Sequence, residues 1–423
     1  QYGTPYTMSV FSSWGVPGSM EIKPEITAPG GAIYSVDGSV PGGKAYELMS
    51  GTSMAAPQVA GMAALAAQYI RANKLDEKTG LTVRALSQSL LMSTATPLLE
   101  EDSGFNDYSV LRQGAGLANI GAVTTADSYI MMAENATAGA ADGKVKAELG
   151  DDPDRTGSYN FSFTLHNLTD SPLSYVLRTD LFTQDVFEDN GYRYLDTQTR
   201  ALAVDAGFTS GGNPVLSGDD VLVYDLNGDG KTNQQDADFL LEYLLGNETK
   251  LNADGDINGD GKVNTYDAHV LLALLEGKSC VTVPAAGQVQ VEVTMTLPQA
   301  VKEYLDTASP KGAYVEGYVY AAPVATEEGE QGVTHSIPVL GFYGNWTEPS
   351  MYDVSSPLEL KYGTDTRMPY LQAYHNSLLV TYGGESQEYY FGGNPVVQDE
   401  TYLTARNAFN NQGGNSISTL VFS

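Results

Sequence analysis

The sequence predicts a multidomain chain. An α/β unit comes first, an antiparallel β-sandwich follows, and a small α-helical module is inserted into the sandwich. Three observations support this. Apolar residues recur at helical spacing in the first 125 residues, the period changes to two after about residue 140, and a segment rich in Asp, Asn and Gly interrupts the strand pattern. A chain of 423 residues has room for about two to four domains.

The α/β unit, residues 1–125, combines a short strand with helices. Ile26-Thr27-Ala28 runs into a Pro-Gly-Gly turn, which predicts a strand that ends there. From Met54 to Ile70, small and apolar residues repeat as on one face of a helix. Their low volume predicts a helix that packs tightly in a core. A second helix is predicted from Thr82 to Met92.

The β-sandwich is predicted for residues 140–218 and 279–350. Apolar and polar residues alternate in Tyr159–Leu165, Val289–Leu297 and Tyr314–Tyr320, and polar turns separate these runs. Residues 351–423 are rich in Tyr and patterned as strands, so we expect a further β-rich segment that is truncated. The strand pattern stands on both sides of residues 219–278, which predicts that those residues are an insertion.

Composition excludes several classes of partner. Lys and Arg number 22 against 52 Asp and Glu, so the net charge is 22 − 52 = −30. This argues against binding to nucleic acid or to anionic membranes, because both require a basic face. No apolar run reaches the roughly 18 residues of a membrane span. The single cysteine, Cys280, excludes a disulfide framework, and we expect it to be a small buried residue.

The first candidate for chemistry is Ser53, within Gly51-Thr52-Ser53-Met54-Ala55-Ala56-Pro57. A serine nucleophile must be exposed, and it needs a base and donors for an oxyanion. At the start of a helix, unpaired N–H groups and the helix dipole favour negative charge. Gly51 permits a tight turn, and we expect Pro57 near the first turn, where a missing N–H costs little. The alternative is that Ser53 merely caps the helix.

Residues 51–61 resemble the nucleophile motif of subtilisin-like serine proteases. Phe11–Gly15 and Lys23–Gly30 resemble the segments that precede that motif, and Gln113–Asn119 resembles the Gly-rich closing strand of the family. Within the family, Trp14 and the following β domains are most similar to the large cell-envelope proteinases of Gram-positive bacteria. Two further segments, Tyr314–Val319 and Ile337–Gly344, resemble strands of their fibronectin-like domain.

This resemblance implies that Ser53 is the acylating nucleophile and that its backbone N–H is one oxyanion donor. The family places its triad Asp, its His and an oxyanion Asn further upstream than 52 residues allow. All four histidines follow Ser53, and we expect them to be structural or surface residues: His166, His269, His335 and His375. Gln1 is not an initiator Met, and both ends look cut. We therefore expect a piece of a longer protein that lacks the catalytic base and is inactive alone.

The second candidate is a pair of twelve-residue loops that repeat at a spacing of 31 residues. Oxygen-bearing side chains stand at positions 1, 3, 5, 9 and 12, Gly stands at position 6, and position 7 offers its backbone carbonyl. Such hard ligands suit Ca²⁺ and not zinc, so we predict two calcium ions. The predicted ligands are Asp225, Asn227, Asp229, Lys231, Asn233 and Asp236 in the first loop, and Asp256, Asn258, Asp260, Lys262, Asn264 and Asp267 in the second.

Each loop leads into a helix, Ala237–Leu245 and Ala268–Leu275, whereas Val221–Tyr224 before the first loop is patterned as a strand. Residues 219–278 closely resemble a type I dockerin, which implies two Ca²⁺ ions and a cohesin domain on a scaffold protein as partner. In that family, loop positions 10 and 11 select the partner. These residues differ between the repeats, Gln234-Gln235 against Thr265-Tyr266, so we expect one preferred orientation of binding. The alternative is that the loops only rigidify the sandwich.

Two functions follow. The first is a secreted endopeptidase, extracellular or at the cell surface, that cleaves protein or peptide substrates through Ser53 and is moored by its dockerin. The second is a non-catalytic adhesion or scaffold-binding protein that retains a relic protease half. The intact motif around Ser53 favours the first function, because a relic has no need to keep it.

Overall fold

The computed structural model describes residues 7–15, 20–39, 45–100, 106–132, 142–189, 192–211, 213–216, 224–248, 250–324 and 332–347, and the backbone of three strands beyond them. The chain forms two compact units, residues 1–348 and 349–423. In the second unit, β16 (Ser377–Tyr382) pairs with β17 (Glu385–Tyr390) and with β18 (Ser416–Val421), both antiparallel. The β pattern expected after residue 350 is therefore present in these strands.

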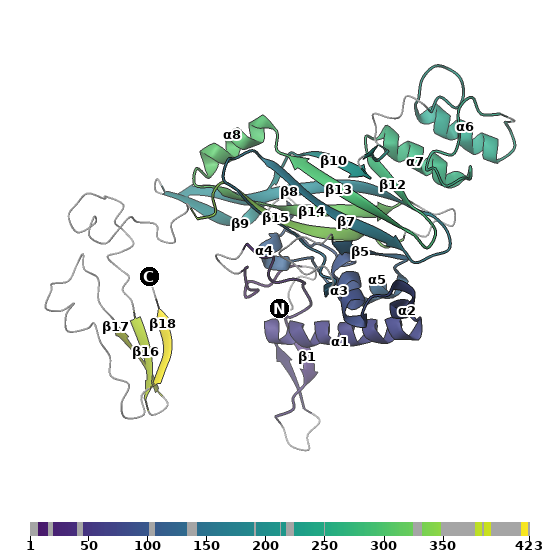
Figure 1. Cartoon of the computed structure of the whole chain (residues 1–423). Coiled ribbons are helices and arrows are strands. Elements are labelled where there is room, and N and C mark those ends of the chain that lie inside the picture. The colour runs from purple at the N-terminus through teal and green to yellow at the C-terminus, as the bar shows by residue number, and fades with distance from the viewer. Residues whose placement is uncertain are drawn as a thin grey trace. The chain divides into compact units, whose positions relative to one another are not determined.

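The first part of unit 1 is mainly helical (Figure 1). The predicted helices are found as α1 and α3, and Thr82 caps α3. The tight core packing expected for the first of them is wrong, because only Ala66 and Ile70 of α1 are buried. The elements are β1 (Ile33–Val36), β2 (Tyr46–Met49), α1 (Thr52–Ala72), α2 (Leu75–Thr79), α3 (Val83–Ser93), β3 (Leu99–Glu100), β4 (Asn106–Asp107), α4 (Val110–Gln113) and α5 (Ile120–Thr125).

The prediction of a strand at Ile26–Ala28 is wrong. Thr27 forms only a parallel bridge to Leu117, and Leu117 in turn bridges Thr96. A strand needs a continuous partner on at least one side. The partner segment here follows directly after α4, which ends at Gln113. Only the few residues around Leu117 are therefore extended and able to pair. The Gly-rich segment from Gln113 is likewise a helix end followed by these bridges.

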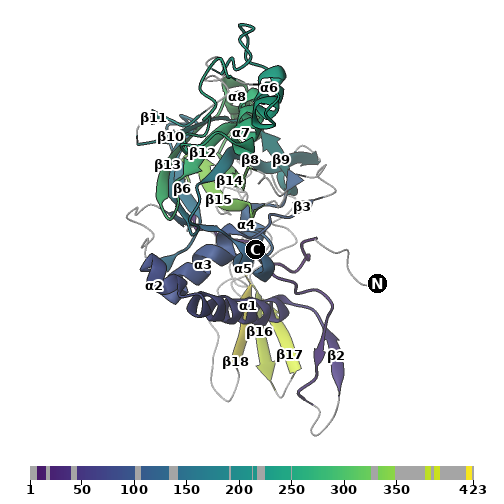
Figure 2. The same ribbon diagram turned by 90° about the vertical axis from the view of Figure 1, so that its right-hand side faces the viewer.

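Two sheets make the sandwich (Figure 2). One has the order β11-β10-β13-β7-β5, and the other has the order β12-β8-β14-β15-β6, with β9 paired to β8. The strands are β5 (Ser128–Met132), β6 (Ala147–Asp152), β7 (Ser158–Asn167), β8 (Leu173–Asp189), β9 (Tyr192–Leu202), β10 (Asp205–Ser210), β11 (Asn213–Pro214), β12 (Ser279–Val283), β13 (Gln288–Thr296), β14 (Ala313–Pro323) and β15 (His335–Tyr343).

The pairing is antiparallel as predicted, with one exception. Strand β6 runs parallel to β15 with a register shift at Leu340. Helix α8 (Gln299–Ala308) joins β13 to β14, and its position was not predicted. The similarity of this sandwich to a fibronectin-like domain remains a prediction.

Alternating apolar residues of both sheets fill the sandwich core. On β7, Phe163 and Leu165 point into it, and Phe163 lies opposite Val291 of β13. The period of two places such residues on one face of the sheet, where burial of each large side chain contributes about 2–3 kcal/mol.

Strands β14 and β15 differ, because both of their faces are buried. Tyr318 and Leu340 lie on the outer face and pack with Ile22, Val110 and Leu111 of the preceding helical part. Tyr318 also donates a hydrogen bond of 2.7 Å to the backbone carbonyl of Gly114. The helical part is therefore fixed to the outside of the six-stranded sheet.

The inserted module lies between β11 and β12. It contains α6 (Gln234–Leu244) and α7 (Thr265–Leu275), close to the two predicted exit helices. Within the described residues, no regular helix leads directly into either loop, and Val221–Val223 of the predicted strand lie outside those residues. An antiparallel bridge from Leu216 to Cys280 closes the base of the insertion. Cys280 is buried as expected, and burial raises the pKa of its thiol to about 12.

Candidate functional site

Ser53 lies in the first turn of α1, and its side chain is exposed. Gly51 occupies the N-cap position, and no side chain caps this helix. Ser53 therefore does not serve as the cap that the alternative interpretation required. Its N–H is among the first N–H groups of the helix, which have no acceptor within the helix. A nucleophile with a free N–H at the positive end of a long helix suits the stabilisation of an oxyanion.

Gly51 makes the approach to Ser53 possible. Its φ of 157° and ψ of 163° fall in a region that is essentially restricted to glycine. The N–H of Gly51 donates to the Gly30 carbonyl at 2.8 Å, and a Cβ added at Gly30 would lie 2.8 Å from the Gly51 carbonyl. Gln58 donates from Nε2 to the Pro29 carbonyl at 2.7 Å. The Pro29-Gly30 turn thus holds the start of α1 in place.

Pro57 does not lie near the first turn as expected. Since α1 begins at Thr52, Pro57 is the sixth helical residue. A proline there removes the hydrogen bond to the carbonyl four residues earlier, which belongs to Ser53. The backbone of Ser53 is consequently freed at its carbonyl as well as at its N–H.

In the described part of the chain, the histidines contact other residues and not Ser53. His166 of β7 stacks on Tyr129 with a ring separation of 4.5 Å, and burial lowers its pKa. His269 is exposed on α7. His335 of β15 is fully buried between Ser128 and Ser93, and burial lowers its pKa to about 4. These three are structural or surface residues, whereas His375 lies outside the described residues.

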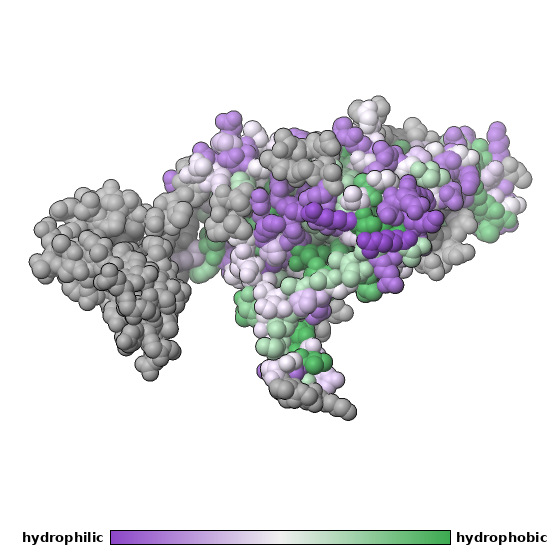
Figure 3. Space-filling view, turned by 60° about the horizontal axis from the view of Figure 1, so that its bottom comes forward, coloured by the Kyte–Doolittle hydropathy of each residue, from purple (hydrophilic) through white to green (hydrophobic). Residues whose placement is uncertain are grey.

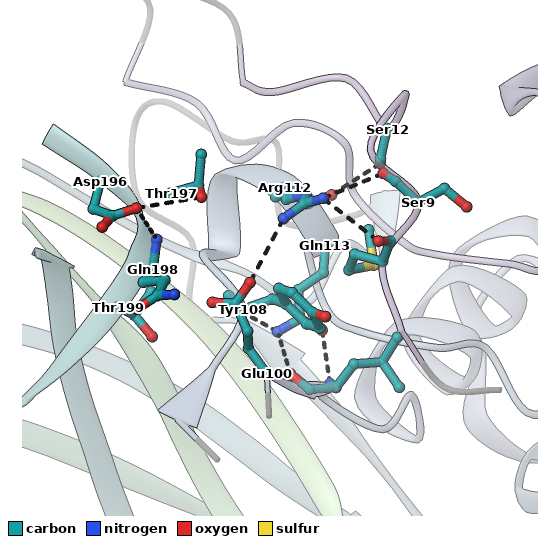
Figure 4. A network of polar contacts seen from close by, with 12 residues as sticks. Ser9, Ser12, Glu100, Tyr108, Arg112, Gln113, Asp196, Thr197, Gln198 and Thr199 are labelled. Carbon is teal, nitrogen blue, oxygen red and sulfur yellow. Dashed lines mark hydrogen bonds and ion pairs between the residues drawn. The ribbon is translucent and has the colours of Figure 1, made fainter. Parts of the chain in front are cut away.

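A buried arginine holds the Phe11–Gly15 segment in place (Figure 4). The Arg112 guanidinium donates to the Ser9 carbonyl at 3.3 Å and lies over the rings of Trp14 and Tyr108, 5.7 and 5.2 Å from their centres. It also pairs with Glu100 at 4.0 Å. Sequence reasoning did not identify this role of Arg112, although a cation directly before Gln113-Gly114 was a usable signal.

The adjacent Gln113 is fully buried and hydrogen-bonded at both ends of its amide. Its Oε1 accepts from the Leu98 N–H at 2.7 Å, and its Nε2 donates to the Tyr108 carbonyl at 2.8 Å (Figure 4). Gln113 thereby ties the Gly-rich segment that begins with it to the β3–β4 region.

Glu316 is a second residue that sequence reasoning missed. It is completely buried on β14, and its carboxylate accepts a hydrogen bond of 2.6 Å from the Ser109 hydroxyl. Burial raises the pKa of Glu316 to about 7. An acid within the apolar run Tyr314–Tyr320 was the signal that could have marked it. Glu316 joins the sandwich to the start of α4.

The two predicted calcium loops have the same backbone geometry. Gly230 and Gly261 at position 6 have φ of 83° and 84°, as the sharp turn requires. In the first loop, Asp225 accepts backbone N–H bonds from Gly228, Asp229 and Gly230 at 2.8–3.0 Å. In the second, Asp256 accepts the N–H bonds of Asp260 and Gly261 at 3.0 and 2.8 Å. The carboxylate at position 1 is thus anchored at the centre of each loop.

Positions 9 and 12 also shape the helix that follows. Asn233 and Asp236 form a capping box at the start of α6, and Asn264 and Asp267 form another at the start of α7. Asp236 and Asp267 are fully buried. Burial first, and then the charge of Asp256, raise the pKa of Asp267. A cation among these oxygens would offset the electrostatic cost of burying them.

Each loop fits calcium only when its carboxylates, Asn side chains and backbone carbonyl are taken together. Within the described residues, no group of three or more Asp, Glu, His or Cys side chains is arranged to hold a metal ion. The carboxylates therefore do not form a site alone. Each loop adds two Asn side chains and the position-7 carbonyl of Lys231 or Lys262, and hard neutral oxygens of this kind are usual calcium ligands. The residues present suit the ion in chemistry and in order along the chain.

Comparison with known families agrees with both resemblances. Residues 3–116 match the subtilase family, and residues 223–276 match the type I dockerin domain. The chain thus carries a subtilase segment and a type I dockerin, which are the families predicted from the motifs. No helix in the described residues combines the length and apolar character that crossing a membrane requires.

Among curated relatives, the PIII-type proteinase of Lactococcus lactis subsp. cremoris (strain SK11) is 26% identical over 424 residues, which cover 96% of this chain and 16% of that protein. The C5a peptidase of Streptococcus pyogenes is 34% identical over 180 residues, 42% of this chain and 14% of that protein. The matched region thus spans only 16% and 14% of the length of these two relatives.

Two solved structures that match this chain are too dissimilar to support a fold assignment. A family 123 glycoside hydrolase from Clostridium perfringens is matched with a TM-score of 0.21 at 8% identity, over 48% of this chain and 23% of that one. The PapD-like domain 7 of human CEP192 is matched with a TM-score of 0.22, also at 8% identity, over 51% of this chain and 84% of that one.

Proposed function

We propose that this chain, which carries a subtilase segment and a type I dockerin, is part of a secreted subtilisin-like serine endopeptidase that its dockerin moors to a cohesin-bearing scaffold. The observation that carries the peptidase role is the placement of Ser53. It is exposed in the first turn of α1, it does not cap the helix, and the Gly51–Gly30 contact holds the turn that precedes it.

In the proposed reaction, Ser53 Oγ attacks the carbonyl carbon of a peptide bond while a base removes its proton. The carbonyl oxygen becomes an oxyanion, and the N–H of Ser53 donates to it. The amine then leaves with a proton, and water hydrolyses the acyl-enzyme. No described histidine is placed as the base. We therefore propose that the triad Asp and His come from residues of the longer protein, and that the 423-residue chain is inactive alone.

A fluorophosphonate probe that labels activated serines tests this proposal. We expect the longer native protein to be labelled on the peptide that contains Ser53. Labelling of the 423-residue chain should be slower by roughly 10⁶-fold, the usual cost of losing a triad. Ser53→Ala in the native protein is the control and should abolish labelling. A native protein that folds but is not labelled would favour the second function, a scaffold-binding protein with a relic peptidase half.

We further propose that Asp225, Asn227, Asp229, Lys231, Asn233 and Asp236, and their counterparts Asp256, Asn258, Asp260, Lys262, Asn264 and Asp267, hold one Ca²⁺ each. The buried carboxylates of Asp236 and Asp267 at position 12 support this, and the charge of Asp256 acts on Asp267. Chelation should unfold residues 219–278 and leave the sandwich strands paired. Hydrogen exchange of α6 and α7 measures this, and equal protection with and without chelator would contradict it.

The domain boundaries remain proposals in the same sense. They are residues 1–125 for the peptidase segment, 140–218 and 279–350 for a fibronectin-like sandwich, 219–278 for the dockerin, and 351–423 for a β-rich segment. Protein or peptide substrates, a cohesin domain as partner and an extracellular or cell-surface location follow from the proposed function. Limited proteolysis with mass spectrometry would locate the boundaries.

A further inference from the structure

The two predicted calcium loops are alike in their internal contacts but differ in their surroundings. Each has an Asn at position 3 whose Oδ1 accepts the N–H of the Asp at position 5, at 2.9 Å in Asn227 and at 3.0 Å in Asn258. Asn258 is only 7% exposed, whereas Asn227 is half-buried. Position 5 differs in the same direction, since Asp260 is half-buried and Asp229 is exposed. The loops have the same residue types at both positions, so the difference arises from what packs beside the second loop.

The sandwich packs beside the second loop. Asn258 Nδ2 donates a long hydrogen bond of 3.4 Å to the hydroxyl of Ser174, which lies on β8 and is 2% exposed. The core of the module also continues into Cys280 of β12, and Val176 of β8 packs against it. Figure 1 shows the module at the end of the sandwich where β12 lies. The second loop therefore contacts the sandwich through one of its predicted calcium ligands.

The first loop is held from within the module instead. Asn252, which lies between the two loops, donates from Nδ2 to the Asp225 carbonyl at 2.9 Å. Its N–H donates to the Leu226 carbonyl, also at 2.9 Å. Neither contact involves a residue of the sandwich. A change in the sandwich near Ser174 should therefore reach the second loop and not the first.

Ser174 is itself held in place by the strands beside it. Its hydroxyl lies 3.0 Å from that of Thr282 on β12, and its carbonyl accepts the Val324 N–H at 2.9 Å. The Ser174 hydroxyl can thus accept a hydrogen bond from Asn258 while it donates one to Thr282. An Asn amide that is turned over presents its NH₂ group in place of its oxygen. A fixed acceptor for Nδ2 on the sandwich therefore keeps Oδ1 on the side of the loop.

Resting on the proposed calcium binding of the second loop, we propose that Ser174 is a positioning residue for that site. It holds the Asn258 amide so that Oδ1 is available as the position-3 ligand, and it thereby couples calcium at this loop to the edge of the sandwich formed by β8 and β12. Contacts that orient a ligand in this way raise metal affinity, because the ligand is already ordered before the ion binds. Among the described residues, no hydrogen bond joins the Asn227 amide to the sandwich in this way.

Hydrogen exchange of the whole chain in buffers of graded free calcium tests this role. The midpoint of a loop is the free calcium concentration that gives half of its protection. Ser174→Ala should raise the midpoint of the second loop at least about threefold, as the loss of one hydrogen bond allows, and leave that of the first loop within about 1.5-fold. Ser336→Ala is the matched control, because it removes an equally buried hydroxyl that bonds to the Ala95 carbonyl from β15. It should move neither midpoint by more than about 1.5-fold.

A second substitution separates positioning from packing. In Asn258→Asp both terminal atoms are oxygens, so the ion no longer depends on which way the group is turned. Adding Ser174→Ala to Asn258→Asp should therefore change the second midpoint by less than about 1.5-fold. A rise as large as in the chain that keeps Asn258 would overturn the inference, because Ser174 would then act through packing alone.

Circular dichroism checks that each variant folds. If Ser174→Ala does not fold, Thr282→Val takes its place, since it removes the hydroxyl that holds Ser174. The midpoint of the second loop should then rise at least about twofold, and a smaller rise would overturn the inference.

The remaining outcomes separate this inference from the proposed function. If calcium protects both loops but Ser174→Ala leaves the second midpoint unchanged, the positioning role is wrong and the proposed calcium sites stand. If both midpoints rise equally, the assignment of Ser174 to the second loop is wrong. If calcium protects neither loop, the proposed calcium binding and this inference fail together.

Discussion

The sandwich and the segment around Ser53 contrast in how they treat apolar side chains. The sandwich encloses a continuous core between its two sheets. Between Val10 and Leu65, large hydrophobic side chains are instead exposed, and several lie on the hairpin β1–β2 or on α1. They are Val10, Phe11, Trp14, Tyr34, Val36, Tyr46, Leu48, Met49 and Leu65. Figure 3 shows hydrophobic residues gathered on this side of the molecule.

This contrast indicates that the two regions are stabilised in different ways. The sandwich can be stabilised by its own core, whereas the segment around Ser53 has apolar surface that the described residues do not cover. Contiguous exposed surface of this kind usually marks a contact with further protein. The same surface adjoins the helix that carries Ser53, which agrees with the proposal that other residues complete the peptidase.

The largest expected effect separates the two regions by their cores. Phe163→Ala removes a completely buried ring of the sandwich, and such changes usually cost about 3–5 kcal/mol of unfolding free energy. Val36→Ala on β1 removes a side chain that is 68% exposed, and its cost should stay within about 0.5 kcal/mol. Urea unfolding of both variants measures the difference. Similar costs for the two substitutions would mean that the hairpin is buried in solution.

A smaller effect is expected at the junction of the two regions. Burial raises the pKa of Glu316 to about 7 from its ordinary 4.5. The folded state therefore holds this proton more tightly, and stability falls as the pH rises from about 4.5 to 7. The shift corresponds to about 3 kcal/mol. Glu316→Gln keeps an acceptor for Ser109 without the charge, so it should be about 3 kcal/mol more stable than the unmodified chain at pH 8.

The control for this prediction is the difference in unfolding free energy between the Glu316→Gln variant and the unmodified chain. Asp107, whose pKa is also raised to about 7, changes stability in the same direction. His335, whose pKa is lowered to about 4, loses stability as the pH falls below about 6.5 and so acts in the opposite direction. Both are present in each protein and cancel in the subtraction. If this difference in unfolding free energy is the same at pH 4.5 and at pH 8, burial does not raise the pKa of Glu316, and the prediction is wrong.

Local periodicity predicted the elements that carry their own pattern. The helices near Met54–Ile70 and Thr82–Met92 and the strands around Phe163 and Val291 are present as their periodicity predicts, although α1 buries only Ala66 and Ile70. The loops of the dockerin were predictable for another reason, since ligand order and the position-6 glycines lie within twelve consecutive residues.

Features that depend on distant partners could not be predicted. Thr27 is extended, yet it makes only a bridge because its partner Leu117 belongs to a short segment. The parallel pairing of β6 with β15 joins residues about 190 positions apart. The burial of Glu316 depends on where α4 packs. Helix α8 had a usable signal, since Val301, Tyr304 and Leu305 are spaced as on a helix, but the run is only ten residues long.

The smallest expected effect concerns the starts of α1 and α3. At α3, the Thr82 hydroxyl accepts the Ala85 N–H at 3.1 Å. Thr82→Ala should therefore cost about 1 kcal/mol of unfolding free energy, the usual value of an N-cap. At α1 no side chain caps the helix, and Ser53 is exposed in its first turn. Ser53→Ala should leave stability unchanged within about 0.5 kcal/mol.

Thermal unfolding of both variants, with the unmodified chain as reference, compares the contributions of Ser53 and Thr82 to stability directly. If Ser53→Ala costs as much as Thr82→Ala, then Ser53 contributes to folding and its presence needs no catalytic explanation. If Ser53→Ala costs nothing, the serine is dispensable for the fold. Its retention at the exposed, positive end of α1, beside apolar surface that the described residues leave open, then has its explanation in the acyl transfer proposed for the completed peptidase.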